Sequence, residues 1–227
     1  MAVDDRQSVE RRPLRSRDVA LFQSLARLLN HWHVSPNAIS LLSVVLACGA
    51  AAALASTPWV ESSIWQRVLW LTGALLIQGR LLANMLDGMV AVESGRASAL
   101  GELFNEIPDR ISDPLILIGA GYAVGGGAEL GYIAAACALF VAYIRAIGAN
   151  VGAGQRFEGP MAKPHRMFVL TLVSVYCGLA PMSWQPIHTS SGMGVMAAGL
   201  IIVIGGCVAT VWRRLIRIVA HCRGASH

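Results

Sequence analysis

The sequence predicts an all-α integral membrane protein in which six transmembrane helices follow an N-terminal amphipathic helix at the membrane interface. Two observations lead to this fold class. Of the 227 residues, 55% are hydrophobic and only 14% are charged, whereas about 25% are charged in an average soluble domain. Apolar stretches long enough to cross a hydrocarbon core of about 30 Å also recur along the chain. This composition disfavours the alternative, a single large soluble helical domain.

The segment before the first apolar stretch divides into a tail and a helix. Residues 1–17 are polar and basic, and residues 18–32 (DVALFQSLARLLNHW) repeat apolar positions at helical spacing. Gln23 and Arg27 fall on another face of this helix. We therefore expect an amphipathic helix over residues 18–33 that lies in the cytoplasmic interface of the membrane.

The six predicted spans form one transmembrane domain over residues 34–216, and a cytoplasmic tail over residues 217–227 follows it. Ser35 and Pro36 predict the start of the first span, with proline near the first helical position. The fifth span is short, and we expect it to begin nearer Lys163. The spans are predicted at residues 38–56, 64–86, 100–124, 130–151, 167–179 and 192–212.

The basic residues are distributed unevenly between the two ends of these spans, and this distribution predicts the topology. One side holds only Arg67, whereas the other holds the basic residues of the N-terminal segment, of the C-terminal tail and of the connections after the second and fourth spans. By the positive-inside rule, both termini then lie in the cytoplasm. The net charge of +5 reflects this orientation and anionic lipid headgroups rather than nucleic acid binding.

One segment, from Asn84 to Asp113, concentrates carboxylates and amides. Asn84, Asp87 and Gly88 lie at positions i, i+3 and i+4, on one face of the cytoplasmic end of the second span. Ionisable residues within or at the ends of transmembrane helices cost free energy, so a functional role is the first interpretation. A second stripe repeats at i+4 spacing along the start of the third span: Gly101, Asn105, Asp109 and Asp113.

Two such helices joined by a short loop bring four to five oxygen ligands to one point. Ligation by oxygen alone suits hard cations such as Mg²⁺, Mn²⁺ or Ca²⁺. The alternative is that the acidic residues cap helices or are solvated loop charges, and we favour it only for Glu93 and Glu102. Gly88, Ala91 and Gly101 leave space on the same faces for a nucleotide or phosphate to approach the backbone.

Two prolines, Pro108 and Pro114, are expected to interrupt the third span. Each proline frees the carbonyl group four residues before it, on Phe104 and Arg110. A freed carbonyl at membrane depth needs a partner, and a hydrated cavity or an ion supplies one. The prolines therefore support a polar site within the membrane domain.

This segment resembles the motif of the CDP-alcohol phosphotransferase family. From Asn84 to Asp109 it reads N-x-x-D-G-x-x-A-V-x8-G-x3-N-x3-D, against D-x-x-D-G-x-x-A-R-x8-G-x3-D-x3-D in the family. Residues 34–40 (VSPNAIS) are similar to the family's TPN-x-(I/L)-T sequence at the start of the first span. Residues 143–146 (YIRA) and 159–166 (GPMAKPHR) are similar to its later basic segments. The identical motif positions are Asp87, Gly88, Ala91, Gly101 and Asp109.

The resemblance implies an enzyme of phospholipid biosynthesis. It implies metal-dependent transfer of a phosphatidyl or related substituted phosphate group from a CDP-linked lipid, such as CDP-diacylglycerol, to an alcohol, with release of CMP. It also implies a homodimer in a bacterial inner membrane with the active site facing the cytoplasm. In the family, the first three motif aspartates help to ligate two divalent ions, Mg²⁺ or Mn²⁺, and the fourth, here Asp109, deprotonates the acceptor hydroxyl group.

The resemblance also assigns substrate-binding roles outside the metal site. Gly88, Ala91 and Gly101 would line the nucleotide site. The phosphates would be bound by basic residues, for which the alternative role is anchoring at the cytoplasmic interface: Arg145, Lys163 and Arg166.

Three positions depart from the family motif, namely Asn84, Val92 and Asn105. The four aligned metal positions carry a charge of −2 instead of −4, which leaves two divalent ions poorly neutralised. Either one ion is bound, or Glu106 and Asp113 complete the site, and we favour the second alternative. The expected metal ligands are Asn84, Asp87, Asn105, Asp109 and Asp113.

Several alternatives remain open at this point. Arg80 lies two turns before Asp87, and we expect Glu106 or a lipid phosphate as its partner. The lost aspartates leave open a member of the fold that binds nucleotide or lipid without turnover. A transporter would need broken helices repeated in two halves, and no internal repeat is visible. Close helix approach in the expected homodimer is attributed to small residues: Gly119, Gly121, Gly192, Gly194, Gly199, Gly205 and Gly206.

Overall fold

The computed structural model describes residues 20–93, 99–154 and 159–224, and the regular secondary structure in these ranges is helical. The predicted tail over residues 1–17, Arg96 and Arg156 lie outside them. Short 3₁₀ turns, Thr57–Trp59 and Met182–Trp184, join α2 to α3 and follow α6. The α-helices in the described ranges are α1 (Ala20–His31), α2 (Pro36–Ala55), α3 (Ser63–Glu93), α4 (Ala99–Tyr122), α5 (Ala128–Asn150), α6 (Lys163–Leu179) and α7 (Val195–Gly224).

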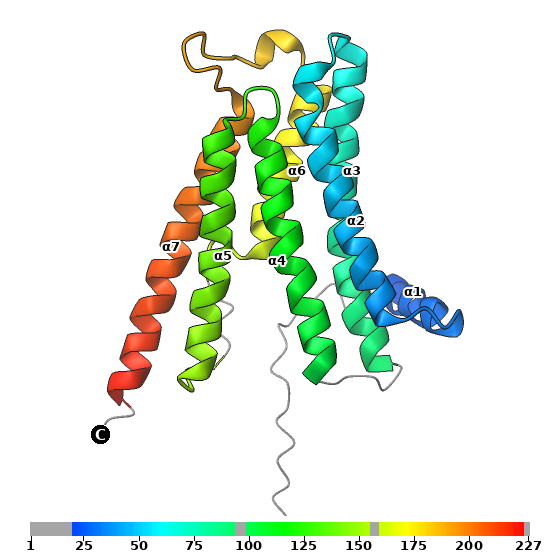
Figure 1. Ribbon diagram of the computed structural model, residues 1–227, viewed down its shortest axis with the longest axis vertical. Coiled ribbons are helices and arrows are strands. Elements are labelled where there is room, and N and C mark those ends of the chain that lie inside the picture. The colour runs from blue at the N-terminus through cyan, green and yellow to red at the C-terminus, as the bar shows by residue number, and fades with distance from the viewer. Residues whose placement is uncertain (1–19, 94–98, 155–158, 225–227) are drawn as a thin grey trace, which may run out of the picture.

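Helices α2 to α7 run side by side, and α1 lies across one end of the bundle (Figure 1). Helix α4 packs on α2 and α5, whereas α3 packs on α2 and α6, and α7 packs on α5. A single apolar core joins them, with Trp70, Leu117, Leu170 and Met196 fully buried. Helix α1 packs on α3 through Ala26. The α1 end of the bundle is therefore also the end that carries the motif residues of α3.

The start of α2 confirms the predicted cap. The hydroxyl of Ser35 accepts a hydrogen bond from the backbone N–H of Ala38 at 3.2 Å, and Pro36 occupies the first helical position. Serine satisfies an N–H group that the helix leaves unpaired, and proline has no N–H group to lose there. This cap marks the beginning of α2, the helix that carries Ser40.

Within the part of the chain that the structure describes, four helices are long and apolar enough to cross a membrane, namely α2, α3, α5 and α7. Helix α6 has 17 residues, and it begins at Lys163 as expected. Helix α4 carries charged residues through its middle, and both helices lie among the four apolar ones (Figure 1). That α4 and α6 also cross the membrane, which would give six spans, therefore remains a prediction. The position of α1 at the membrane interface also remains a prediction.

One local prediction was wrong, and the predicted C-terminal tail contains helix. Helix α4 runs without a break through Pro108 and Pro114, which were expected to interrupt it. Packing on both sides holds the backbone helical where a proline removes only one hydrogen bond. Helix α7 continues to Gly224, so most of the segment expected to be a tail after residue 216 is helical.

Most of the glycines that were assigned to a dimer interface pack inside the chain. A Cβ atom on Gly119 would lie 2.6 Å from the Cα atom of Ala51, and one on Gly121 would lie 2.8 Å from the Cα atom of Gly131. Gly199 and Gly206 face side chains of this chain in the same way. Only small residues allow such close approach of two backbones. These glycines therefore build the bundle itself, and the homodimer remains a prediction without their support.

Candidate active site

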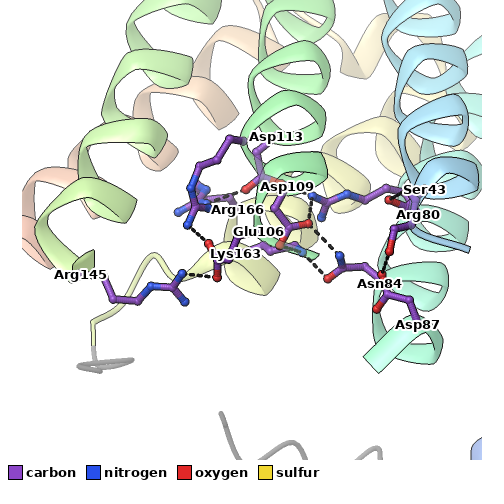
Figure 2. A network of polar contacts seen from close by, with 12 residues as sticks. Ser43, Arg80, Asn84, Asp87, Glu106, Asp109, Asp113, Arg145, Lys163 and Arg166 are labelled. Atoms are coloured by element: carbon purple, nitrogen blue, oxygen red, sulfur yellow. Dashed lines mark hydrogen bonds and ion pairs between the residues drawn. The ribbon is translucent and has the colours of Figure 1, made fainter. Parts of the chain in front are cut away.

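Polar side chains from five helices meet at the α1 end of the bundle (Figure 2). Helix α3 supplies Arg80, Asn84 and Asp87, one turn apart along one face, and α4 supplies Glu106, Asp109 and Asp113. Helix α2 contributes Ser40, α5 contributes Arg145, and α6 contributes Lys163 and Arg166. The spacing argument from the sequence is confirmed to this extent, because the faces of α3 and α4 do look toward one another.

Asp113 is buried between two arginines. The Nη2 atom of Arg80, a fully buried side chain, lies 2.7 Å from Oδ1 of Asp113. The Nη2 atom of Arg166 donates a hydrogen bond to Oδ2 at 2.6 Å, and its Nη1 atom donates to the carbonyl of Met161 at 3.0 Å. Both carboxylate oxygens are thus neutralised by protein cations. This arrangement differs from the expectations that Asp113 ligates a metal and that Arg166 binds a phosphate.

Asp109 lies at the centre of the site, in contact with three side chains. Its Oδ1 atom accepts hydrogen bonds from Arg80 and from the side-chain amide of Asn84, each at 2.9 Å. Its Oδ2 atom forms an ion pair with the ammonium group of Lys163, and the same ammonium donates to Oδ1 of Asn84. Arg80 therefore pairs with Asp109 and Asp113 and not with Glu106, its expected protein partner, whereas a contact with a lipid phosphate remains a prediction.

Asp87 differs from Asp109 and Asp113 because no ion pair is seen for it among the described residues. Its side chain is buried, with 2% of the residue exposed, and Oδ2 accepts a hydrogen bond from the hydroxyl of Ser40 at 2.6 Å. The Oδ1 atom has no hydrogen-bond partner among the described residues. Leaving a buried carboxylate oxygen unpaired costs free energy. The unpaired Oδ1 atom of Asp87 is therefore an oxygen of this site to which a cation can bind.

Sequence reasoning missed Ser40, the hydroxyl partner of Asp87. Ser40 closes the stretch VSPNAIS, whose resemblance to the family was noted only as a helix start. Its hydroxyl also donates to the carbonyl of Pro36, four residues earlier. The available signal was the spacing of Ser40 and Ser43, which lie three positions apart and so share one face of a helix. Nothing in the local pattern indicated that this face would lie against Asp87.

Glu106 is bound by two arginines at the edge of the site. It accepts hydrogen bonds from Arg110, one turn along α4, and from Arg145 of α5. Glu106 is therefore held as an anchor for Arg145, which differs from the expectation that it completes the metal site. Gly88 and Ala91 continue the Asn84 face of α3. The structure does not describe the side-chain surroundings of Gly101 and Asn105, so the predictions for these two residues are not tested.

The site fits one divalent cation better than two. Within the described residues, no group of three or more His, Cys, Asp or Glu side chains could hold a metal ion. Five protein cations already neutralise most of the carboxylate oxygens, whereas Oδ1 of Asp87 remains unpaired. A hard cation prefers such an oxygen. These observations support a single ion beside Asp87.

Comparison with known proteins places this geometry in context. No protein-family model matches the sequence. The chain is 31% identical over 157 residues to an archaetidylinositol phosphate synthase of Aeropyrum pernix, which covers 67% of this chain and 74% of that protein. It is 27% identical over 173 residues to the inner membrane protein YnbA of Escherichia coli, which covers 73% of this chain and 82% of that protein.

Solved structures share the fold. A phosphatidylinositol phosphate synthase of Mycobacterium tuberculosis, in complex with manganese and citrate, superposes with a TM-score of 0.68 at 19% identity. The match covers 87% of this chain and 88% of that chain. The same synthase with CDP-DAG bound gives a TM-score of 0.67 and covers 87% of this chain and 93% of that chain.

Proposed function

This chain belongs to the CDP-alcohol phosphotransferase family, and we propose that it transfers a phosphatidyl or related substituted phosphate group from a CDP-linked lipid to an alcohol. As a member of this family it is a transferase of phospholipid biosynthesis that resides in a membrane. The relative of known location is an inner membrane protein, so we infer a bacterial inner membrane as its location. The positive-inside rule then places the site end of the bundle at the cytoplasmic face.

The observation that carries the proposal is the convergence of Asp87, Asp109 and Lys163 at one end of the bundle. The carboxylate of Asp87, with its unpaired oxygen, and several cations lie close together there (Figure 2). A pyrophosphate linkage carries several negative charges, and cations bind it through charge-assisted hydrogen bonds. The partly exposed cations Arg145 and Lys163 are therefore suited to hold the phosphates of a CDP-linked donor beside Asp109.

Each residue has a distinct part in the proposed reaction. The acceptor hydroxyl oxygen attacks the lipid-bearing phosphorus, the bond from that phosphorus to the CMP oxygen breaks, and CMP leaves with the electron pair. Asp109 accepts the hydroxyl proton, which is work suited to a positioned carboxylate. Arg80 and Asn84 orient that carboxylate through its Oδ1 atom. Arg145, at the edge of the site, is placed to approach the donor phosphates.

A divalent ion, Mg²⁺ or Mn²⁺, would be held chiefly by Asp87. The neighbouring synthase in complex with manganese supports this choice, and so does the unpaired Oδ1 atom. When bound, such an ion would neutralise charge that develops on the phosphate oxygens. Gly88 and Ala91, one turn beyond Asn84 and Asp87, leave room on the same face for the cytidine moiety.

The test is release of CMP from CDP-diacylglycerol by the purified chain. The names of two of the proteins compared above contain inositol phosphate, but no residue of this chain identifies its alcohol, so the assay uses a panel that includes inositol phosphate, glycerol phosphate, serine and choline. We expect CMP with at least one alcohol in Mg²⁺ or Mn²⁺ and none in EDTA. Tight binding of CDP-diacylglycerol without CMP release under any condition would instead indicate a binding protein without turnover.

A matched pair of variants tests the role of Asp109. Asp109→Asn keeps the size of the side chain but removes its ability to accept a proton. We expect a loss in CMP formation of about 10²- to 10⁴-fold, the range typical of a general base. Glu129→Gln, an exposed acidic residue in the first turn of α5 at the opposite end of the bundle, serves as the control. Equal rates for both variants would contradict the assignment.

A further inference from the structure

Lys163 is the only lysine in a chain that has 18 lysine and arginine residues together. Every other basic position, at the membrane interface and in the buried network alike, is arginine. Arginine presents a flat fork of donors, whereas lysine ends in a compact, strongly hydrated point charge. The single use of lysine therefore indicates a position where a compact charge is needed.

The position of Lys163 is unfavourable for a cation unless anions surround it. Lys163 is the first residue of α6, and no side chain caps that end of the helix. Helix N-termini carry partial positive charge, so a cation there is destabilised. Contacts with Asp109 and with the amide oxygen of Asn84 offset this cost (Figure 2). The helix therefore holds the ammonium in place for these oxygens.

The two oxygens that Lys163 contacts belong to positions at which the family motif has aspartate, 84 and 109. At position 84 this chain has asparagine, which offers an oxygen but no negative charge. A divalent ion between a neutral amide and one carboxylate would be poorly neutralised, whereas an ammonium group leaves no excess charge on this pair. The lower negative charge at position 84 therefore suits a monovalent cation such as the ammonium group of Lys163 better than a divalent ion.

We propose that the ammonium group of Lys163 permanently occupies one cation position of the site, so that the chain binds one divalent ion instead of two. That single ion lies at Asp87, which among the buried carboxylates of the described residues has an oxygen with neither a hydrogen-bond donor nor a paired cation, whereas Oδ1 of Asp113 faces Arg80. The inference rests on the proposed function only for the role of the ion in the reaction. Because the number of bound ions is measured without turnover, the claim about Lys163 can be wrong while the proposed reaction is right.

The first experiment counts Mn²⁺ ions by electron paramagnetic resonance titration in the presence of CMP. We expect one ion for the wild type and one for Asn84→Asp, because Lys163 pairs with the new carboxylate. We expect two for Asn84→Asp combined with Lys163→Met. Loss of the ammonium group vacates the cation position, and the new carboxylate supplies the negative charge that a second divalent ion needs. Asn84→Asp alone is the matched control, since the two variants differ only at Lys163.

Each other outcome of the count overturns a specific claim. Two ions in the wild type, or one ion in the double variant, would overturn the role of Lys163 and leave the proposed reaction intact. No ion in the wild type would overturn both the single-ion site and the metal requirement of the proposed function. Production of CMP in EDTA would identify that last case independently.

A second measurement uses the wild type alone and does not depend on how the variants fold. Because the chain has one lysine, labelling lysine with ¹³C at the ε carbon gives one side-chain resonance. We expect this resonance to keep its position when saturating Mg²⁺ and CMP are added, because the ammonium stays between Asn84 and Asp109. A move of the resonance to the position of a solvent-exposed lysine would overturn the proposal.

Discussion

The two halves of α4 are held in the bundle by opposite means. The C-terminal half of α4 packs by close backbone contact, with Gly119 against Ala51 of α2 and Gly121 against Gly131 of α5. The half near α1 is held by charge, with Asp109 and Asp113 paired to cations of α3 and α6. The first kind of contact leaves no room for a ligand, whereas the second consists of groups that a charged substrate can also bind.

Within the charged half, the exposed fraction of each side chain separates residues that hold the helices together from residues that a substrate can reach. Asp113 and its two arginines are nearly inaccessible, whereas Asp109 and Lys163 remain partly exposed. Asp113 therefore belongs to the scaffold although it lies one turn from Asp109. The difference teaches that a charged residue in a membrane helix is not by that fact a ligand for substrate.

The largest expected effect tests the role of Asp113. Asp113→Ala leaves the buried guanidinium group of Arg166 without its carboxylate and leaves that of Arg80 with Asp109 alone. Breaking a buried ion pair in this way lowers the free energy of unfolding by about 3–5 kcal/mol. Unfolding in mixed micelles with increasing SDS measures it. A variant as stable as the wild type would show that Asp113 is not part of the scaffold.

The next effect tests the apolar half. Gly119→Ala places a methyl group 2.6 Å from the Cα atom of Ala51, so α2 and α4 must separate. We expect a loss of about 1–3 kcal/mol in the free energy of unfolding, as for other overpacked cores. Gly205→Ala in α7, where no atom lies within 4 Å, is the control and is expected to be neutral or slightly stabilising. Equal losses in both would contradict close packing at Gly119.

A smaller effect is expected at the connection between α4 and α5. The hydroxyl of Thr57 accepts a hydrogen bond from the backbone N–H of Val124 at 3.0 Å, and Thr57 is fully buried. Thr57→Val keeps the shape but leaves that N–H group unpaired, which costs about 1–2 kcal/mol. The same SDS titration measures the loss. CMP formation per folded molecule is expected to stay unchanged, because the contact lies at the end away from the site.

The smallest effect is expected at Glu106. Its side chain is 44% exposed, and ion pairs of this exposure contribute at most about 1 kcal/mol. Glu106→Gln is therefore expected to change the free energy of unfolding by less than about 1 kcal/mol, and added salt reduces the difference further. A loss as large as that of Asp113→Ala would place Glu106 in the scaffold.

The sequence predicted what lies along one helix better than what lies between helices. The cap at Ser35 and the shared face of Asn84 and Asp87 depend on residues within two turns, and both were confirmed. The pairing of Arg80 with Asp113 joins residues 33 positions apart in the sequence. Periodicity gives the face of a helix but not the helix that lies opposite, so Arg80 and Arg166 were assigned other partners.

The contrast between the two halves is tested most directly by the stabilisation that CDP-diacylglycerol gives with Mn²⁺. A ligand that binds only the folded state stabilises it by about 2.7 kcal/mol at a concentration of 100 times its Kd. Gly119→Ala is expected to keep the full stabilisation despite its lower starting stability, and Asp87→Asn is expected to lose most of it. Full stabilisation of Asp87→Asn, or its loss in Gly119→Ala, would contradict the assignment of ligand binding to the charged half.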